Sequence, residues 1–548
     1  MASVAVVAAS ERLADHIVRA LRESASVELC ERAPADRRLT IHDADWLQRF
    51  DTVVYAPPGH DRSASAPDLT ATSALFDALT RTRLAQFVAV SSAAIYSADH
   101  HNVGLMDESA FITDRGRDIV RRWMAFEHEA GHTVPAETVV TILRPAAVLD
   151  GANYFSRLLG GAVAVTYPGH DPTIQLLSPV DLAGAIRAVI ERRARGVFNV
   201  APAGGVPLKR ALQLAGPVRL PVPRTLQRLA RAVLAPAGLA ASSEQLTYIQ
   251  YLWTVSGDKL RRDVGFTPSR SSAQAILDLR GRSTADLPQF DEFGMDPDYI
   301  RRYCRQLFHV LHEYYWRVEV DGLDRIPREG RGVLVGMHRG FMPFDGTMAL
   351  YDLVRRVGRI PRFLIHPSLT KFPFLADFMG KLGGIMACQE NGDYVLQRDE
   401  LLGVFPEGIR GAFTMYKRAY TLGKFGRDEY VRMALRNRAP ILPFVTVGSA
   451  EIYPILGRVN WNWFTRYTEW PFFPVTNPVP LPTKWHTRFL PPMHIELEYP
   501  PEAADDPALV RKISVEVRQR MQATIDDMLL RRRSIFSGTI FDQVEKPS

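Results

Sequence analysis

Residues 332–346, "GVLVGMHRGFMPFDG", join an apolar run to a short loop that holds one histidine and one aspartate. The run "GVLVGM" is typical of a buried strand, and the glycine and proline that follow predict a tight turn. Histidine can take a proton from a hydroxyl near neutral pH, and a nearby carboxylate can hold the ring in the required tautomer. His338 and Asp345 are therefore a candidate catalytic pair, although in isolation the pattern fits a turn with an exposed histidine better.

A second segment, "LLGVFPEGIRGAF" at residues 401–413, has the same construction of an apolar strand that ends in a Gly/Pro loop. Its loop carries Glu407 and Arg410, and the planar guanidinium of arginine can bind a phosphate through two hydrogen bonds. The later segment "APILPFVTVGSAE" at residues 439–451 predicts a third strand, which we expect Pro443 to break. The three strands indicate an α/β domain with polar groups in its loops.

These segments, with "YYWRVEVDGLDRIPREGRGVLVGMH" before them and "YVRMALRNRAPILPFVTVGS" around the third strand, resemble the phospholipid/glycerol acyltransferase family. This family is part of the lysophospholipid acyltransferase superfamily, and the resemblance covers about residues 310 to 530. It implies a C-terminal α/β acyltransferase domain with His338 as catalytic base and Asp345 as the carboxylate that orients it. The residues that it implies for shaping the acceptor or phosphate site are Phe405, Pro406, Glu407, Gly408, Arg410 and Gly411.

The C-terminal part of the chain departs from the acyltransferase family pattern at two places. Six residues separate His338 from Asp345, where the common family block has four, but the loop keeps the Pro-x-Asp ending of a longer form. Gln389 stands where related enzymes tend to carry an arginine, which weakens the case for a phosphorylated acceptor and leaves diacylglycerol or a long-chain alcohol open. Arg339 could supply the missing cation, or it could be a solvated arginine.

The resemblance implies an acyl thioester donor, either acyl-CoA or acyl carrier protein, and a lipid acceptor with a free hydroxyl. We expect no metal or redox cofactor. The chain has three cysteines that are far apart in sequence, so it shows neither a disulfide framework nor zinc-ligand spacing. No activating pattern surrounds Cys388, and we expect it to be a small buried residue rather than a nucleophile.

The first part of the chain alternates buried strands with amphipathic helices, which predicts a doubly wound parallel sheet. The pieces "FVAVSSAAIYS", "VVTILRPAAVLD", "IQLLSPVDLAGAI" and "GVFNVAPAGG" resemble extended short-chain dehydrogenases/reductases, the NAD-dependent epimerase/dehydratase group. This resemblance implies a Rossmann-like fold. A polar Pro/Gly/Asp stretch then favours a boundary near residue 285, with an N-terminal domain at 1–285 and the acyltransferase domain at 286–548.

The chemistry of that dehydrogenase group is missing from the sequence. The chain has no glycine before Gly59, no tyrosine between Tyr96 and Tyr154, and no lysine before Lys209. Glycine is needed where the backbone approaches a pyrophosphate closely. We therefore expect an inactive domain that does not bind NAD(P), fused to an O-acyltransferase. Two alternatives stay open: a bifunctional reductase and acyltransferase, and a non-enzymatic lipid-binding scaffold.

The net charge of +7 suits an anionic partner, and we expect a membrane surface rather than nucleic acid. No apolar run is long enough to span a bilayer, so the expected location is cytoplasmic with peripheral membrane association. Three of eight tryptophans lie in "WNWFTRYTEWPFFP", residues 461–474, a composition typical of a lipid headgroup boundary but also of an aromatic core. The expected contact set is Trp461, Trp463, Phe464, Tyr467 and Trp470, backed by Arg466, Lys484 and Arg488, with Trp485 and the basic segment 224–235 as further candidates.

Overall fold

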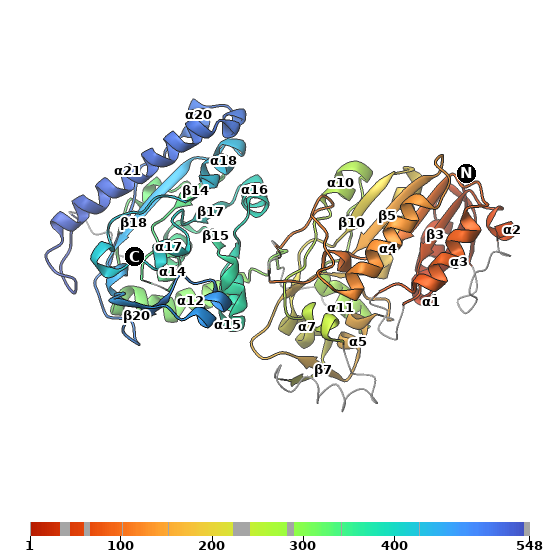
Figure 1. Ribbon diagram of the computed structural model, residues 1–548, viewed down its shortest axis with the longest axis horizontal. Coiled ribbons are helices and arrows are strands. Elements are labelled where there is room, and N and C mark those ends of the chain that lie inside the picture. The colour runs from red at the N-terminus through yellow and green to blue at the C-terminus, as the bar shows by residue number, and fades with distance from the viewer. Residues whose placement is uncertain are drawn as a thin grey trace. The chain divides into compact units, whose positions relative to one another are not determined.

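The computed structural model describes residues 2–541, apart from 33–43, 60–65, 101, 103, 152, 223–241, 282–289, 341 and 427. The chain forms two compact units, Met1–Gly294 and Met295–Ser548, drawn in Figure 1. The change from one unit to the next therefore comes slightly later than residue 285.

A six-stranded parallel sheet organises the first unit, in the order β10-β5-β4-β3-β1-β2. Its strands are β1 (Ala2–Ala8), β2 (Val27–Arg32), β3 (Thr52–Ala56), β4 (Gln86–Val90), β5 (Val139–Pro145) and β10 (Gly196–Val200). The second strand lies on one side of β1 and all later strands lie on the other, so the winding reverses at β1. This reversal defines a doubly wound sheet, and the fold predicted for this part of the chain is confirmed.

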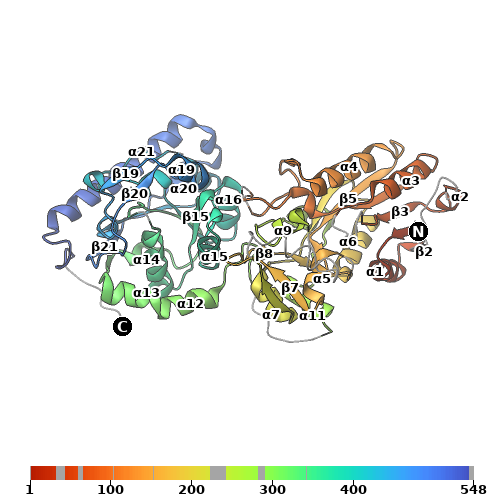
Figure 2. The same cartoon turned by 60° about the horizontal axis from the view of Figure 1, so that its bottom comes forward.

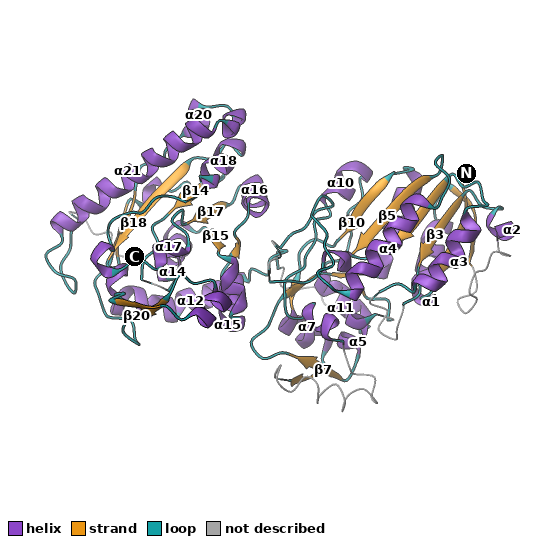
Figure 3. Cartoon of the chain, in the orientation of Figure 1, coloured by secondary structure: helices purple, strands orange, loops and turns teal. Residues whose placement is uncertain are grey.

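Helices cover both faces of this sheet (Figure 3). Val4 and Val6 pack with α1 (Glu11–Arg22) and α6 (Pro179–Glu191), whereas Ala5 between them faces the opposite core with α3 (Leu69–Leu79) and α4 (Asp118–His132). This alternation follows from the two-residue period of a strand. The other helices of the described residues are α2 (Ala44–Leu47), α5 (Tyr154–Gly160), α7 (Leu208–Ala215), α9 (Ser243–Thr247), α10 (Asp258–Val264) and α11 (Ser272–Leu279), with the short turn η2 (Ala93–Tyr96). The part of this unit that the structure describes also holds three two-stranded pairs: β6 (Ala147–Val148) with β9 (Leu176–Leu177), β7 (Val163–Thr166) with β12 (Val218–Pro221), and β8 (Thr173–Ile174) with β11 (Val206–Pro207).

A seven-stranded mixed sheet organises the second unit, in the order β13-β21-β18-β14-β17-β15-β16. Its strands are β13 (Glu319–Asp321), β14 (Gly332–Val335), β15 (Arg362–Ile365), β16 (Ile385–Met386), β17 (Leu401–Val404), β18 (Ile441–Val447) and β21 (His486–Phe489). Only the pairing of β18 with β21 is antiparallel. This unit is the second α/β domain that the sequence predicts.

The expectation that Pro443 breaks its strand is wrong, because β18 runs continuously through it. Pro443 pairs with Val335 at the last position of the β14–β18 register, and its carbonyl oxygen accepts a hydrogen bond from the Leu490 N–H at 2.9 Å. The strand therefore loses only the donor that proline lacks.

Helices and a hairpin surround the second sheet, as Figure 2 shows from another side. The helices are α12 (Pro297–Arg305), α13 (Leu307–His309), α14 (Phe344–Asp352), α15 (Pro373–Lys381), α16 (Gln389–Gln397), α17 (Ile409–Ala412), α18 (Glu429–Arg436), α19 (Asn462–Thr468), α20 (Ile495–Glu498) and α21 (Pro507–Arg531). The hairpin pairs β19 (Gly457–Val459) with β20 (Phe473–Val475). Short helical turns are η4 (Val310–Tyr315), η5 (Leu323–Arg325), η6 (Leu353–Val357), η7 (Pro367–Lys371), η8 (Tyr416–Arg418), η9 (Ser449–Glu451) and η10 (Pro501–Asp505). Among the helices that the structure describes, none combines the length and apolar character required to cross a bilayer.

Candidate active site

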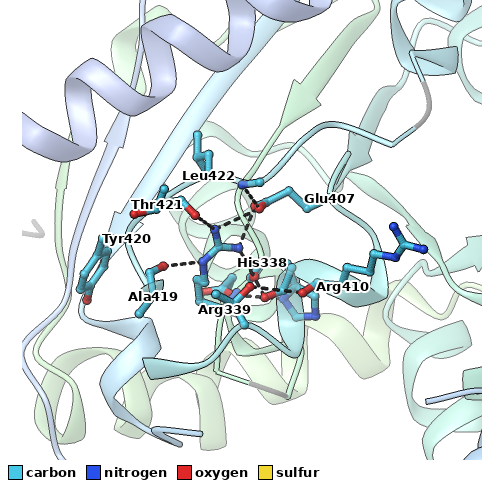
Figure 4. Close-up of polar contacts among 12 residues, drawn as sticks. His338, Arg339, Glu407, Arg410, Ala419, Tyr420, Thr421 and Leu422 are labelled. Atoms are coloured by element: carbon cyan, nitrogen blue, oxygen red, sulfur yellow. Dashed lines mark hydrogen bonds and ion pairs between the residues drawn. The ribbon is translucent and has the colours of Figure 1, made fainter. Parts of the chain in front are cut away.

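Two loops of the second unit form the candidate site. β14 and β17 are adjacent and parallel, so the loops at their carboxyl ends meet at the same edge of the sheet. The first loop contains His338, and the second contains Glu407. Figure 4 shows the polar contacts where these loops meet.

His338 and Asp345 form the pair that the sequence predicts. His338 Nδ1 lies 3.1 Å from Asp345 Oδ2, and the Arg339 backbone N–H donates to the same oxygen at 2.7 Å. A carboxylate only accepts, so Nδ1 carries the proton and Nε2 keeps a lone pair. Asp345 is buried in the first turn of α14, where the helix dipole favours its negative charge, while the His338 side chain remains 16% exposed. The imidazole is thus oriented by a buried group and accessible to a reactant.

The side of the imidazole is held by Phe405, the first residue after β17. The two ring centroids are 5.2 Å apart with the planes tilted by 38°. Phe405 stacks in turn on Phe363 of β15, with centroids 5.6 Å apart. Aromatic contacts of this kind restrict the ring orientation of His338.

Arg339 and Glu407 connect the two loops through a buried ion pair. Arg339 Nη1 and Nη2 donate to the two Glu407 carboxylate oxygens at 2.7 and 3.0 Å, and the side chains are 1% and 5% exposed. Arg339 also donates to carbonyl oxygens of residues 338, 411, 419 and 421, while the Gly423 N–H donates to Glu407 at 2.7 Å. Both expectations for Arg339, a free cation for phosphate and a solvated side chain, are therefore wrong. A buried guanidinium requires partners for its donors, and this one has them within the protein.

The other residues of the Glu407 loop have different surroundings. Arg410 is exposed, its guanidinium extends away from the Arg339–Glu407 pair in Figure 4, and within the described ranges no carboxylate pairs with it. Gly408 has a φ of 57°, which a side chain would disfavour. A Cβ on Gly411 would lie 2.8 Å from Glu407 Cβ, so close packing requires glycine there. The Pro406 carbonyl oxygen accepts from Gly426 N–H at 3.2 Å.

A buried histidine fixes the other end of α14. His312 lies 2.9 Å from Asp352, the last residue of that helix, and 2.9 Å from Glu313. Burial alone would lower the pKa of His312, but the two carboxylates outweigh it and raise the pKa to about 9. The helix that positions Asp345 is therefore held at its far end by an imidazolium ion.

Cys388 caps the start of α16 and has no feature of a nucleophile. Its Sγ accepts a hydrogen bond from the Asn391 N–H at 3.4 Å, and burial raises the pKa of the thiol to about 12. The adjacent Gln389 is exposed in the first turn of the helix.

The aromatic segment near residue 470 is divided between surface and core. Trp485 is fully buried and stacks on Trp316 with ring centroids 4.6 Å apart, so its expected place at a membrane is wrong. Lys484 pairs with Glu319 at 2.9 Å, and Arg488 pairs with Asp321 at 2.7 Å. These two cations are engaged in ion pairs within the protein. They are therefore not the free positive charges that we expected beside the aromatic residues 461–470. The basic segment 224–235 lies outside the described residues.

In the first unit, polar side chains fill the region beyond the carboxyl ends of β4 and β5. Glu127 of α4 pairs with Arg144 at 2.7 Å, and both side chains are at most 10% exposed. Ser91 donates to Glu127 at 2.6 Å, and Tyr96 accepts from Arg144 and donates to Asn199. These polar side chains therefore satisfy one another within the first unit.

A family model matches part of the second unit, and sequence relatives cover about half of the chain. A family model described as "Acyltransferase" matches residues 317–447. An uncharacterized protein of Mycobacterium tuberculosis (strain H37Rv) is 35% identical over 303 residues, which span 51% of this chain and 83% of the relative. An uncharacterized protein of Mycobacterium leprae is 35% identical over 272 residues, which span 47% of this chain and 73% of the relative.

Solved structures also align with about half of the chain. UDP-glucuronic acid 4-epimerase from Bacillus cereus, solved with UDP-glucuronic acid and NAD, is 13% identical over 50% of this chain and 96% of its own, with a TM-score of 0.39. RMD from Pseudomonas aeruginosa, complexed with NADPH, is 15% identical over 51% of this chain and 98% of its own, with a TM-score of 0.39. Scores this low carry no inference about what this chain binds.

Proposed function

Residues 317–447 belong to the acyltransferase family, and we propose that the chain moves a fatty acyl group from a thioester to a lipid hydroxyl, with His338 as general base. The donor is acyl-CoA or acyl carrier protein, and the acceptor is a glycerolipid or another lipid alcohol. The observation that carries the proposal is the His338–Asp345 hydrogen bond, because it leaves Nε2 as a base on the accessible side of a ring that is held in place.

The reaction follows from that geometry. Nε2 takes the proton of the acceptor hydroxyl while its oxygen attacks the thioester carbonyl carbon. Asp345 stabilises the imidazolium that forms and keeps Nδ1 protonated. The tetrahedral intermediate then collapses: the new C–O ester bond remains, the C–S bond breaks, and the thiolate takes the proton from His338. The proton transfers and the exchange of a C–S bond for a C–O bond balance without a metal ion or a redox cofactor.

The other site residues have supporting roles in this proposal. Phe405 restricts the imidazole, and Glu407 acts through Arg339 on the shape of both loops instead of touching the substrate. Arg410 is the exposed cation of the loop, and it offers a bidentate partner for a phosphate of the donor or of the acceptor.

Substitution of His338 tests the proposal directly. With the purified full chain, an acyl-CoA and a panel of lysophospholipid, diacylglycerol and long-chain alcohol acceptors, His338→Ala should reduce product formation by about two to four orders of magnitude. Asp345→Asn should also lose rate, since the amide cannot stabilise the imidazolium in the same way.

His494→Ala is the matched control, because this surface histidine is 54% exposed and pairs only with Glu496 in the described chain. It should retain full activity. A folded His338→Ala protein that still transfers acyl groups at the original rate would exclude His338 as the base.

A further inference from the structure

We propose that residues 456–475, here the aromatic flap, form a docking surface for an anionic lipid bilayer. The flap consists of the β19–β20 hairpin with α19 between its strands. This proposal rests on the proposed function, since a lipid acceptor must reach the site from a membrane, but its test does not depend on catalysis.

Large apolar side chains are exposed along the flap. Trp463 is 68% exposed, Tyr467 53% and Trp461 51%. The other exposed apolar side chains of the flap are Leu456, Val459, Phe473 and Val475. Soluble surfaces seldom concentrate such residues in one short segment, so the flap is expected to be covered by a partner.

The flap is nevertheless an ordered part of the second unit. Trp470 packs between Phe413 and Phe464, with ring centroids 5.2 and 5.4 Å away, and contacts Phe372 at 5.5 Å. These inner aromatics hold the outer tryptophans in a defined place. Phe413 directly follows α17, the helix that contains Arg410, so the flap adjoins the loop of the candidate active site.

The charges around the flap favour an anionic lipid. Arg458 and Arg466 are exposed on it, and Glu469 is its single acidic residue. Lys417 and Arg418 are exposed in η8, which is tied to the base of the flap by a hydrogen bond from the Tyr416 N–H to the Ile455 carbonyl oxygen at 3.0 Å. Tryptophan and tyrosine favour the headgroup region, and nearby basic groups attract an anionic surface.

Vesicle flotation of the full chain tests the proposal. The protein should float with vesicles of phosphatidylcholine and phosphatidylglycerol, and more weakly with phosphatidylcholine alone. High salt should weaken flotation without abolishing it, because salt screens the charges but leaves apolar insertion intact. Trp461→Ser combined with Trp463→Ser should reduce the apparent vesicle affinity by at least about tenfold.

Three controls make the outcome specific. Phe111→Ser removes an aromatic side chain that is 90% exposed in the first unit, and it should float like the original protein. His338→Ala should also float normally while losing acyl transfer, so failure of catalysis and failure of docking are distinguishable. Circular dichroism and thermal unfolding of the double variant should match the original protein, since both tryptophans are more than half exposed.

The proposal is overturned if the original protein binds neither kind of vesicle, or if the folded double variant floats as well as the original. It is also overturned if sedimentation shows a lipid-free dimer that the double variant abolishes, because the flap would then contact a second copy of the chain. Quenching of tryptophan fluorescence by brominated phosphatidylcholine, lost in the double variant, would support insertion of the flap.

Discussion

At the scale of single residues, the site depends on two neighbours with separate tasks. His338 directs its side chain toward Asp345 and the accessible side, while Arg339 directs its guanidinium into the protein toward Glu407. The backbone between them is held from both sides, because the Arg339 N–H binds Asp345 and its side chain binds the His338 carbonyl oxygen at 2.8 Å. The orientation of the base therefore depends on a residue that need not touch the substrate.

Neutralising Glu407 should destabilise the fold strongly. Glu407→Gln leaves the buried Arg339 guanidinium without its counter-charge, a loss that costs about 3–5 kcal/mol in comparable buried pairs. Urea denaturation followed by circular dichroism measures the change. Glu502→Gln, at an exposed position, should stay within about 0.5 kcal/mol of the original protein. An unchanged unfolding midpoint for Glu407→Gln would mean that the ion pair contributes little.

At the scale of elements, α14 is fixed at both ends by charged groups. Its first turn carries Asp345, and its last residue, Asp352, lies 2.9 Å from the buried His312. Arg356 lies 3.6 Å from the same Asp352 carboxylate, and Glu313 is the second acidic partner of His312. The attachment of α14 to η4, the helical turn that contains His312, should therefore depend on the charge of His312.

Stability should fall as the pH rises through the pKa of His312. In the folded state this pKa is raised to about 9 from an ordinary 6.5, so the stabilisation is fully present below 6.5 and is lost as the pH rises past 9. The shift corresponds to about 3 kcal/mol. Denaturant unfolding on both sides of this window measures it.

His312→Gln should remove most of that alkaline loss, because the variant has no imidazolium to deprotonate. His494→Gln, at the exposed histidine, should retain the original pH dependence. An equal alkaline loss in His312→Gln and the original protein would assign the effect to other groups.

At the scale of the whole molecule, two α/β units with separate cores share one chain, and the candidate catalytic pair lies in the second. In the first unit, β1 passes into α1 without a glycine, the Ser10 side chain caps the helix by accepting from Leu13 N–H, and Glu11 occupies the first turn. A carboxylate at this helix terminus disfavours a pyrophosphate, which would seek the same N–H groups.

Calorimetric titration of the full chain with NAD(H) and NADP(H) should detect no binding at micromolar concentrations. The reason is the turn around Ser10 and Glu11, which lacks both the close backbone approach and the free helix terminus that a dinucleotide needs. Acyl-CoA, titrated under the same conditions, is the positive comparison. A micromolar dissociation constant for either dinucleotide would restore the bifunctional alternative.

The sequence by itself determined the two-unit α/β organisation, because strand periodicity is a local property. It offered His338 and Asp345 as a candidate pair, which the family resemblance favoured over a turn with an exposed histidine. It could not assign Arg339 and Trp485 to the interior or Lys484 to its ion pair with Glu319, and it predicted a break at Pro443, where the strand is continuous. Arg339 and Glu407 carry opposite charges in the loops that follow two strands, so the sequence contained a signal for their ion pair. Only the adjacency of β14 and β17 brings those two loops together. Burial likewise depends on which segments pack together. Trp485 lies against Trp316, far away in sequence, and is buried. The ring partners of Trp461 and Trp463 lie within the flap itself, and both tryptophans remain exposed. Tertiary structure alone decides such contacts, because side-chain burial and ion pairing depend on neighbours that are distant along the chain.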